Sequence, residues 1–111
     1  MTQPRIEMEH RWGERFRTNM PVHVSANEEA GILGRMRNLS LSGALLRIEA
    51  DLRLYALIEV SVELPQRSLP PAILLAHVSR KREKDLGIEW CEFAPFAVKD
   101  LLRSPSMRLP L

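Results

Sequence analysis

The stretch YALIEVSVEL, residues 55–64, decides the fold class of this chain. From Ile58 to Leu64 its apolar side chains alternate with polar ones. A period of two places successive side chains on opposite faces of an extended strand, so that one face lies in a core and the other in solvent. Pro65 follows directly and ends the strand, because proline cannot donate a hydrogen bond to a sheet ladder. The stretch therefore predicts a half-buried β-strand.

Five further stretches carry strand patterns, and turn signals lie between them. They are residues 20–25, 31–37, 44–48, 72–79 and 86–93. Six short strands of this kind favour an antiparallel sandwich or a small barrel.

The C-terminal part of the chain is typical of a short helix. Pro95 suits a first helical turn. Four apolar residues then recur at helical spacing, namely Phe96, Ala97, Leu101 and Leu102. The sequence therefore predicts strands followed by one closing helix.

The composition describes one small domain. With 111 residues the chain has room for a single core. Its net charge of +2 is too small to imply broad attraction to nucleic acid or anionic lipid. The single cysteine, Cys91, excludes an internal disulfide and a paired-thiol metal site. We find no signal peptide and no apolar stretch of membrane-spanning length, so we expect a cytoplasmic protein without membrane insertion.

Two short motifs occur in a fixed order along the chain. The first is R-x-x-x-R, formed by Arg11 and Arg15 just before the first predicted strand. The second is N-x-S-x-x-G, formed by Asn38, Ser40 and Gly43 where the second and third strands meet. In this order the sequence resembles the PilZ family of cyclic di-GMP receptors, whose signature is R-x-x-x-R followed by [DN]-x-S-x-x-G.

The surrounding residues support the resemblance. Pro21-Val22 is similar to the start of the family's first strand, and LGIEW at 86–90 is similar to its late G-[VI]-x-aromatic strand. The resemblance implies a PilZ domain over residues 8–103, built as an all-β, six-stranded antiparallel barrel with a short C-terminal α-helix. Residues 1–19 would form a flexible N-terminal arm that carries R-x-x-x-R, and residues 104–111 would form a C-terminal tail.

The chemistry of the motifs suits cyclic di-GMP, which has two phosphates and two guanines. Arginine supplies 13 of the 16 basic residues. Its planar fork binds phosphate oxygens and the O6/N7 edge of guanine. By the resemblance, Arg11 and Arg15 clamp the ligand. Solvated surface arginines are the alternative interpretation of the same two residues.

The second motif would contact a guanine from the barrel. By the resemblance, Asn38 and Ser40 form hydrogen bonds with the guanine base. Gly43 has a structural role and allows a close backbone approach or a positive φ. Asn38 replaces the commoner Asp and has one acceptor oxygen instead of two, so its presence could weaken affinity. A plain β-turn is the alternative interpretation. Arg17 and His77 are further candidate ligand residues, through a phosphate contact and base stacking.

We expect no catalytic activity, no cofactor and no metal. The three histidines, His10, His23 and His77, lie in different elements without ligand spacing. Cys91 has no histidine nearby in sequence, and there is no glycine-rich phosphate loop.

The resemblance therefore implies a bacterial cyclic di-GMP receptor or adaptor, which we expect to be a monomer or weak dimer. Ligand-induced ordering of its arm would signal to a separate effector protein in processes such as motility and biofilm formation. The main alternative is a PilZ-fold adaptor that acts by protein contact without nucleotide. A small barrel that binds RNA or single-stranded DNA would need aromatics interleaved with basic residues. The chain has only six aromatics and no such cluster, so we expect no nucleic acid partner.

Overall fold

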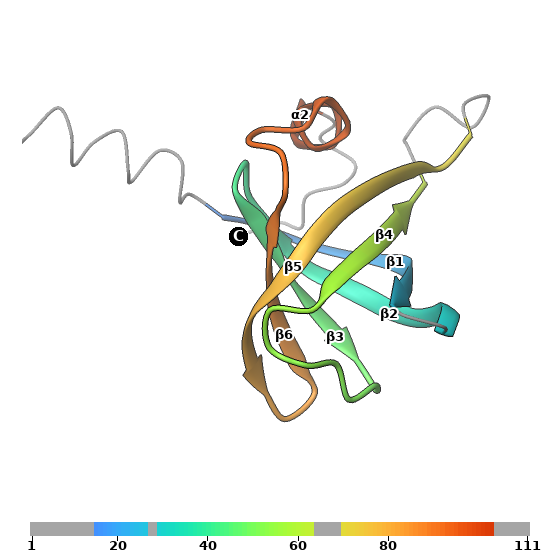
Figure 1. Cartoon of the computed structure of the whole chain (residues 1–111). Helices are drawn as coiled ribbons and strands as arrows, with labels where there is room; N and C mark the ends of the chain where they lie inside the picture. The colour runs from blue at the N-terminus through green and yellow to red at the C-terminus, as the bar shows by residue number, and fades with distance from the viewer. Residues whose placement is uncertain (1–14, 27–28, 64–69, 104–111) are drawn as a thin grey trace, which may run out of the picture.

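Six antiparallel strands close into a barrel in the order β1-β2-β3-β6-β5-β4. The computed structural model describes residues 15–26, 29–63 and 70–103. Figure 1 shows how β4 returns beside β1 and completes the barrel. This arrangement confirms the predicted barrel and excludes the open sandwich. The elements are β1 (Phe16–Ala26), β2 (Glu29–Leu39), β3 (Gly43–Ile48), β4 (Leu57–Val62), β5 (Ala72–Arg82), β6 (Asp85–Trp90) and α2 (Phe96–Arg103).

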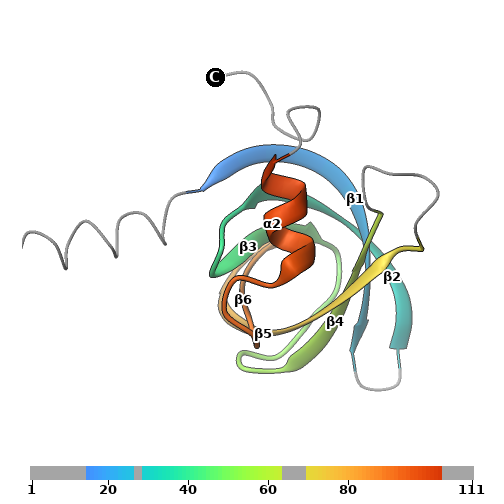
Figure 2. The ribbon, with the colours of Figure 1, turned by 90° about the horizontal axis from the view of Figure 1, so that it is seen from above.

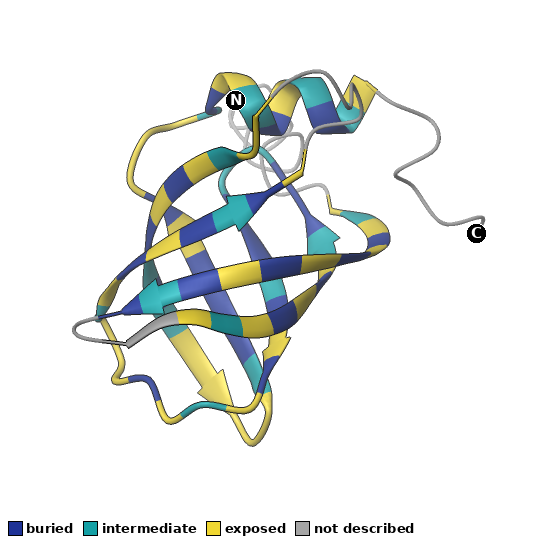
Figure 3. Ribbon diagram, turned by 90° about the vertical axis from the view of Figure 1, so that its right-hand side faces the viewer, coloured by how far each residue is buried: buried dark blue, intermediate teal, exposed yellow. Residues whose placement is uncertain are grey.

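The core lies inside the barrel and follows the alternation seen in the sequence. Along β4, Ile58, Val60 and Val62 are buried and their neighbours face outward (Figure 3). Burying each such side chain contributes roughly 1.5–3 kcal/mol. Seen from above in Figure 2, α2 lies across one end of the barrel. Its buried residues Val98 and Leu101 belong to the same apolar core, so the helix closes that end.

Two strand boundaries differ from the sequence prediction. β1 begins at Phe16 and not at Met20, because Thr18 points into the core and continues the alternation with a polar side chain. Residues 16–19, assigned to the arm from sequence, therefore belong to the barrel. Residues 1–14 and 104–111, the rest of the predicted arm and the tail, lie outside the described residues.

The β5–β6 hairpin is tighter than its charged sequence suggests. β5 continues to Arg82 and β6 starts at Asp85, so the turn is only Glu83–Lys84. Sequence interpretation had assigned residues 80–85 to this turn. The longer strand places Arg80 and Arg82 on a rigid part of the barrel.

In the part of the chain that the structure describes, no helix is long and apolar enough to cross a membrane.

Candidate functional site

The turn between β2 and β3 is organised by the hydroxyl of Ser40, which is fully buried. Its Oγ accepts hydrogen bonds from the backbone N–H groups of Gly43, at 3.1 Å, and Ser42, at 3.3 Å. The same hydroxyl lies 3.2 Å from the carbonyl oxygen of Gly43, to which it donates. Ser40 therefore holds the turn in shape from inside, and its hydroxyl is not exposed at the surface where a ligand would lie.

The turn is also fastened to the end of β6. The indole Nε1 of Trp90 donates a hydrogen bond to the carbonyl oxygen of Ser40 at 3.2 Å. The backbone N–H of Trp90 donates a second one to the carbonyl oxygen of Ser42 at 3.0 Å. Gly43 lies so close to β6 that an added Cβ would overlap the carbonyl oxygen of Ile88. Of the two roles predicted for this glycine, the close backbone approach is the one observed. The turn therefore has a fixed position on the barrel.

The two signature motifs meet at this turn. Arg15, the residue before β1, donates from Nη1 to Oδ1 of Asn38 at 2.8 Å, although the two are 23 residues apart. Partial burial lowers the pKa of the Arg15 guanidinium below its usual value, and the positive charge of Arg80 lowers it further.

The strand register places these residues in one row that runs around the outside of the barrel. Across five strands, one outward-facing row contains Arg17 on β1, Asn38 on β2, Leu45 on β3, Gly87 on β6 and Arg80 on β5. Neighbouring strands lie about 4.8 Å apart, so Asn38 and Arg80 are separated by roughly 14 Å along the row. Three of the six strand spacings separate Asn38 from Arg80, so the row bends around the barrel between them.

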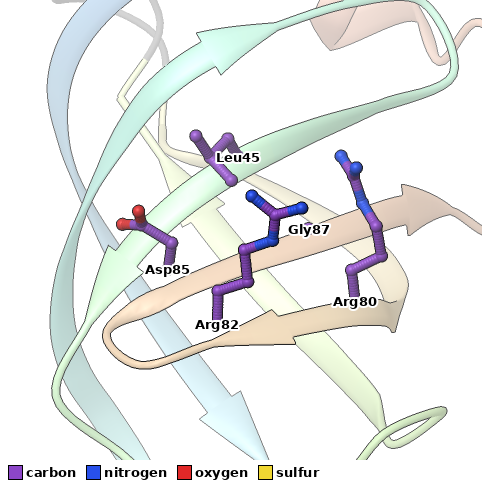
Figure 4. A pocket seen from close by; sticks show the side chains of 5 residues that line it. All are labelled: Leu45, Arg80, Arg82, Asp85 and Gly87. Atoms are coloured by element: carbon purple, nitrogen blue, oxygen red, sulfur yellow. The ribbon is translucent and has the colours of Figure 1, made fainter.

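A shallow hollow of about 180 Å³ lies at the β5 end of this row. Leu45, Arg80, Arg82, Asp85 and Gly87 line it. In Figure 4 both arginine side chains extend from β5 over the strand that carries Gly87. Gly87 has no side chain, and this leaves the hollow open between Leu45 and the two arginine side chains.

The remaining predicted site residues are placed as follows. Arg11 lies outside the described residues. Arg17 is exposed on β1, opposite Asn38. His77 on β5 is half-buried, with Nε2 3.2 Å from Oε1 of Glu89 on β6. Gly43 and His77 both lie opposite Glu89, on either side of β6. These three residues form the row next to the one that contains Asn38, Leu45, Gly87 and Arg80. The structure therefore brings Arg15, Arg17 and Asn38 together near the β2–β3 turn, whereas His77 lies on β5, three strands away from Asn38.

Sequence reasoning missed Arg80 and Arg82. The predicted strands at 72–79 and 86–93 left residues 80–85 for a turn between them, but these two arginines lie two positions apart on β5. Their spacing places both side chains on the same outer face. The sequence does not mark where β5 ends, because charged residues occur both in turns and on the exposed side of strands. The predicted strand therefore stopped before Arg80.

Comparisons with known proteins agree with this geometry. The family model described as PilZ domain matches residues 9–104. A solved structure described as the PilZ domain of CeSA from a cellulose-synthesizing bacterium has the same fold, with a TM-score of 0.60 and 20% sequence identity. The match covers 72% of this chain and 82% of that one. No curated protein matches significantly.

The barrel with its closing helix, the joined motifs and the matching family model all agree. This chain belongs to the PilZ domain family, a family of cyclic di-GMP receptors.

Proposed function

We propose that this chain binds cyclic di-GMP reversibly on the outer barrel face and passes the signal to a separate effector protein in the bacterial cytoplasm. The observation that carries the proposal is the 2.8 Å hydrogen bond between Arg15 and Asn38. It brings the two halves of the family signature to one place, where the first can bind phosphate or guanine and the second can bind a guanine edge.

The residues have distinct roles in this proposal. Arg15 and, from the arm, Arg11 bind the ligand's phosphates and a guanine. Asn38 accepts a hydrogen bond from a guanine N–H group through the Oδ1 that now accepts from Arg15. Ser40 and Gly43 position the turn. A direct contact between Ser40 and the base stays a prediction, because the hydroxyl already serves the turn backbone.

Ligand arrival must open or share the bond between Arg15 and Asn38. Asn38 is neutral, so this is a hydrogen bond between a cation and an amide, not an ion pair with a carboxylate. Opening it leaves no buried unpaired charge, because Arg15 lies at the surface. We propose that Arg15 then swings onto the ligand and that the arm orders with it. The ordered arm would change the surface that the effector protein meets, in processes such as motility or biofilm formation.

Isothermal titration calorimetry with cyclic di-GMP tests the proposal. We expect saturable binding at micromolar or tighter affinity for the native protein, and a loss of at least about tenfold for Arg15→Ala, because a hydrogen bond to a charged group contributes about 1.5–3 kcal/mol. Lys99→Ala is the control, since it removes one positive charge from the exposed side of α2 and should bind normally.

The opposite result would be equally informative. If the folded native protein, checked by circular dichroism, gives no heat at high concentration, the receptor function is wrong. The alternative then holds, in which the chain acts as a PilZ-fold adaptor through protein contact alone.

A further inference from the structure

The hollow between β3, β6 and β5 is not explained by the signature motifs. Its two arginines, Arg80 and Arg82, come from β5, three strands away from Asn38 around the barrel. Neither belongs to R-x-x-x-R or N-x-S-x-x-G. Figure 4 shows both arginine side chains extending from β5 toward the strand that carries Gly87.

The hollow carries an uncompensated positive charge. Its one carboxylate, Asp85, accepts a hydrogen bond from Nε of Arg47 at 3.2 Å and is thereby already paired. Within the described part of the chain, neither Arg80 nor Arg82 forms an ion pair with a carboxylate. Arg80 is also close enough to Arg15 to lower the pKa of that guanidinium. Asp85, which also lies opposite Arg82 in the sheet, is one negative charge beside three arginines, and this excess of positive charge favours binding of an anion from solution.

The size and shape of the hollow limit what it can hold. Its volume of about 180 Å³ lies below the roughly 300–1,000 Å³ of sites that enclose a whole small molecule. It can therefore take one group of a larger ligand. An added Cβ at Gly87 would lie 3.1 Å from Nε of Arg80, so glycine leaves this guanidinium its room to lie over the surface. Guanidinium forks bind phosphate oxygens in pairs.

We infer that Arg80 and Arg82, lying over Gly87, form a phosphate-binding subsite that extends the ligand site from β1 and β2 across to β5. The ligand class is a phosphodiester nucleotide long enough to contact Asn38 and Arg80 together. This inference rests on the proposed function for the identity of the nucleotide. Because the subsite is built on strands, it holds a phosphate in place without any contribution from the arm.

Calorimetry with cyclic di-GMP on Arg80→Ala tests the subsite. We expect affinity to fall about tenfold to a hundredfold, the loss that follows from removing a charge-assisted hydrogen-bond pair. Arg80→Lys keeps the charge but loses the fork, so it should recover only part of that loss. Lys99→Ala again serves as the matched loss of charge. If Arg80→Ala binds like the Lys99→Ala control while the native protein binds cyclic di-GMP, the subsite is wrong and the receptor function stands.

A second measurement separates failure of the subsite from failure of the proposed function. In a ¹⁵N NMR titration with inorganic pyrophosphate, we expect the Gly87 amide and the Arg80 Nε–H signals to shift in the native protein. Those shifts should be absent in Arg80→Ala, whose remaining spectrum reports that it is folded. Shifts at these signals without any cyclic di-GMP binding would keep the subsite and overturn the proposed nucleotide. No shift at either signal would overturn the subsite.

Discussion

At the scale of the single residue, a buried hydroxyl holds the signature turn in shape. Ser40 accepts hydrogen bonds from two backbone N–H groups, those of Ser42 and Gly43. Alanine at this position would leave both donors without the hydroxyl. A buried polar group that loses its partner costs about 1–3 kcal/mol.

We therefore expect Ser40→Ala to lower the free energy of unfolding by about 1–3 kcal/mol. Urea denaturation followed by circular dichroism measures this change. Ser42→Ala is the control, because the Ser42 hydroxyl is half-buried and lies 3.2 Å from a single partner, the Ser40 hydroxyl. Equal stability of Ser40→Ala and the native protein would show that the turn holds its shape without the hydroxyl.

Single residues also show what the sequence could and could not predict about the site. Arg15 and Asn38 were predictable, because motif order places both near one strand junction, and the structure joins them. The role of Ser40 was not, since the partner of a hydroxyl depends on how the turn folds around it. Arg80 was missed because its contribution depends on register across four strands, which no local pattern records.

At the scale of elements, β1 couples the first motif directly to the barrel. The strand starts at Phe16, so Arg15 is the last residue before a rigid element. The sequence hid this start because Thr18, a polar residue, occupies a core position. Where apolar residues fill the core positions, as in β4, the strand was predicted to within two residues at each end. Alternation therefore predicts strand existence better than strand ends.

The arm and β6 each carry one of the two tryptophans, which allows a test of arm ordering. With 5-fluorotryptophan incorporated, Trp12 reports on the arm and Trp90, buried in the core, reports on the barrel. We expect cyclic di-GMP to shift the ¹⁹F signal of Trp12 strongly and that of Trp90 little, because a core residue keeps its packing. Trp12→Phe assigns the two signals. Calorimetric binding with an unmoved Trp12 signal would show that the arm takes no part.

At the scale of the whole molecule, stability and ligand binding draw on different forces. The fold rests on a continuous apolar core that includes residues from every strand and from α2. The three Lys or Arg ion pairs among the described residues are all at least partly exposed, and such pairs contribute about 0–1 kcal/mol each. The proposed ligand face depends instead on guanidinium charges at the surface.

We therefore expect salt to separate the two properties. Raising NaCl from about 0.1 M to about 1 M shortens the screening length from about 10 Å to about 3 Å. Affinity for cyclic di-GMP should fall several-fold, while the thermal midpoint of the free protein should not fall. Calorimetry and differential scanning fluorimetry across one salt series measure both. An affinity for cyclic di-GMP that does not change with NaCl concentration would argue against arginine–phosphate contacts as the main attraction.

The closed barrel has a consequence for how an effector protein recognises this domain. Each of the six strands has a hydrogen-bonded neighbour on both sides over at least part of its length, and the pairing that closes the barrel joins β1 to β4 through His23–Ser25 and Glu59–Ser61. Strand addition, a common mode of peptide recognition, therefore has no full-length edge strand to use in this sheet. An effector that docks on the barrel wall must distinguish bound from free domain by its side chains and by whatever the ligand leaves exposed.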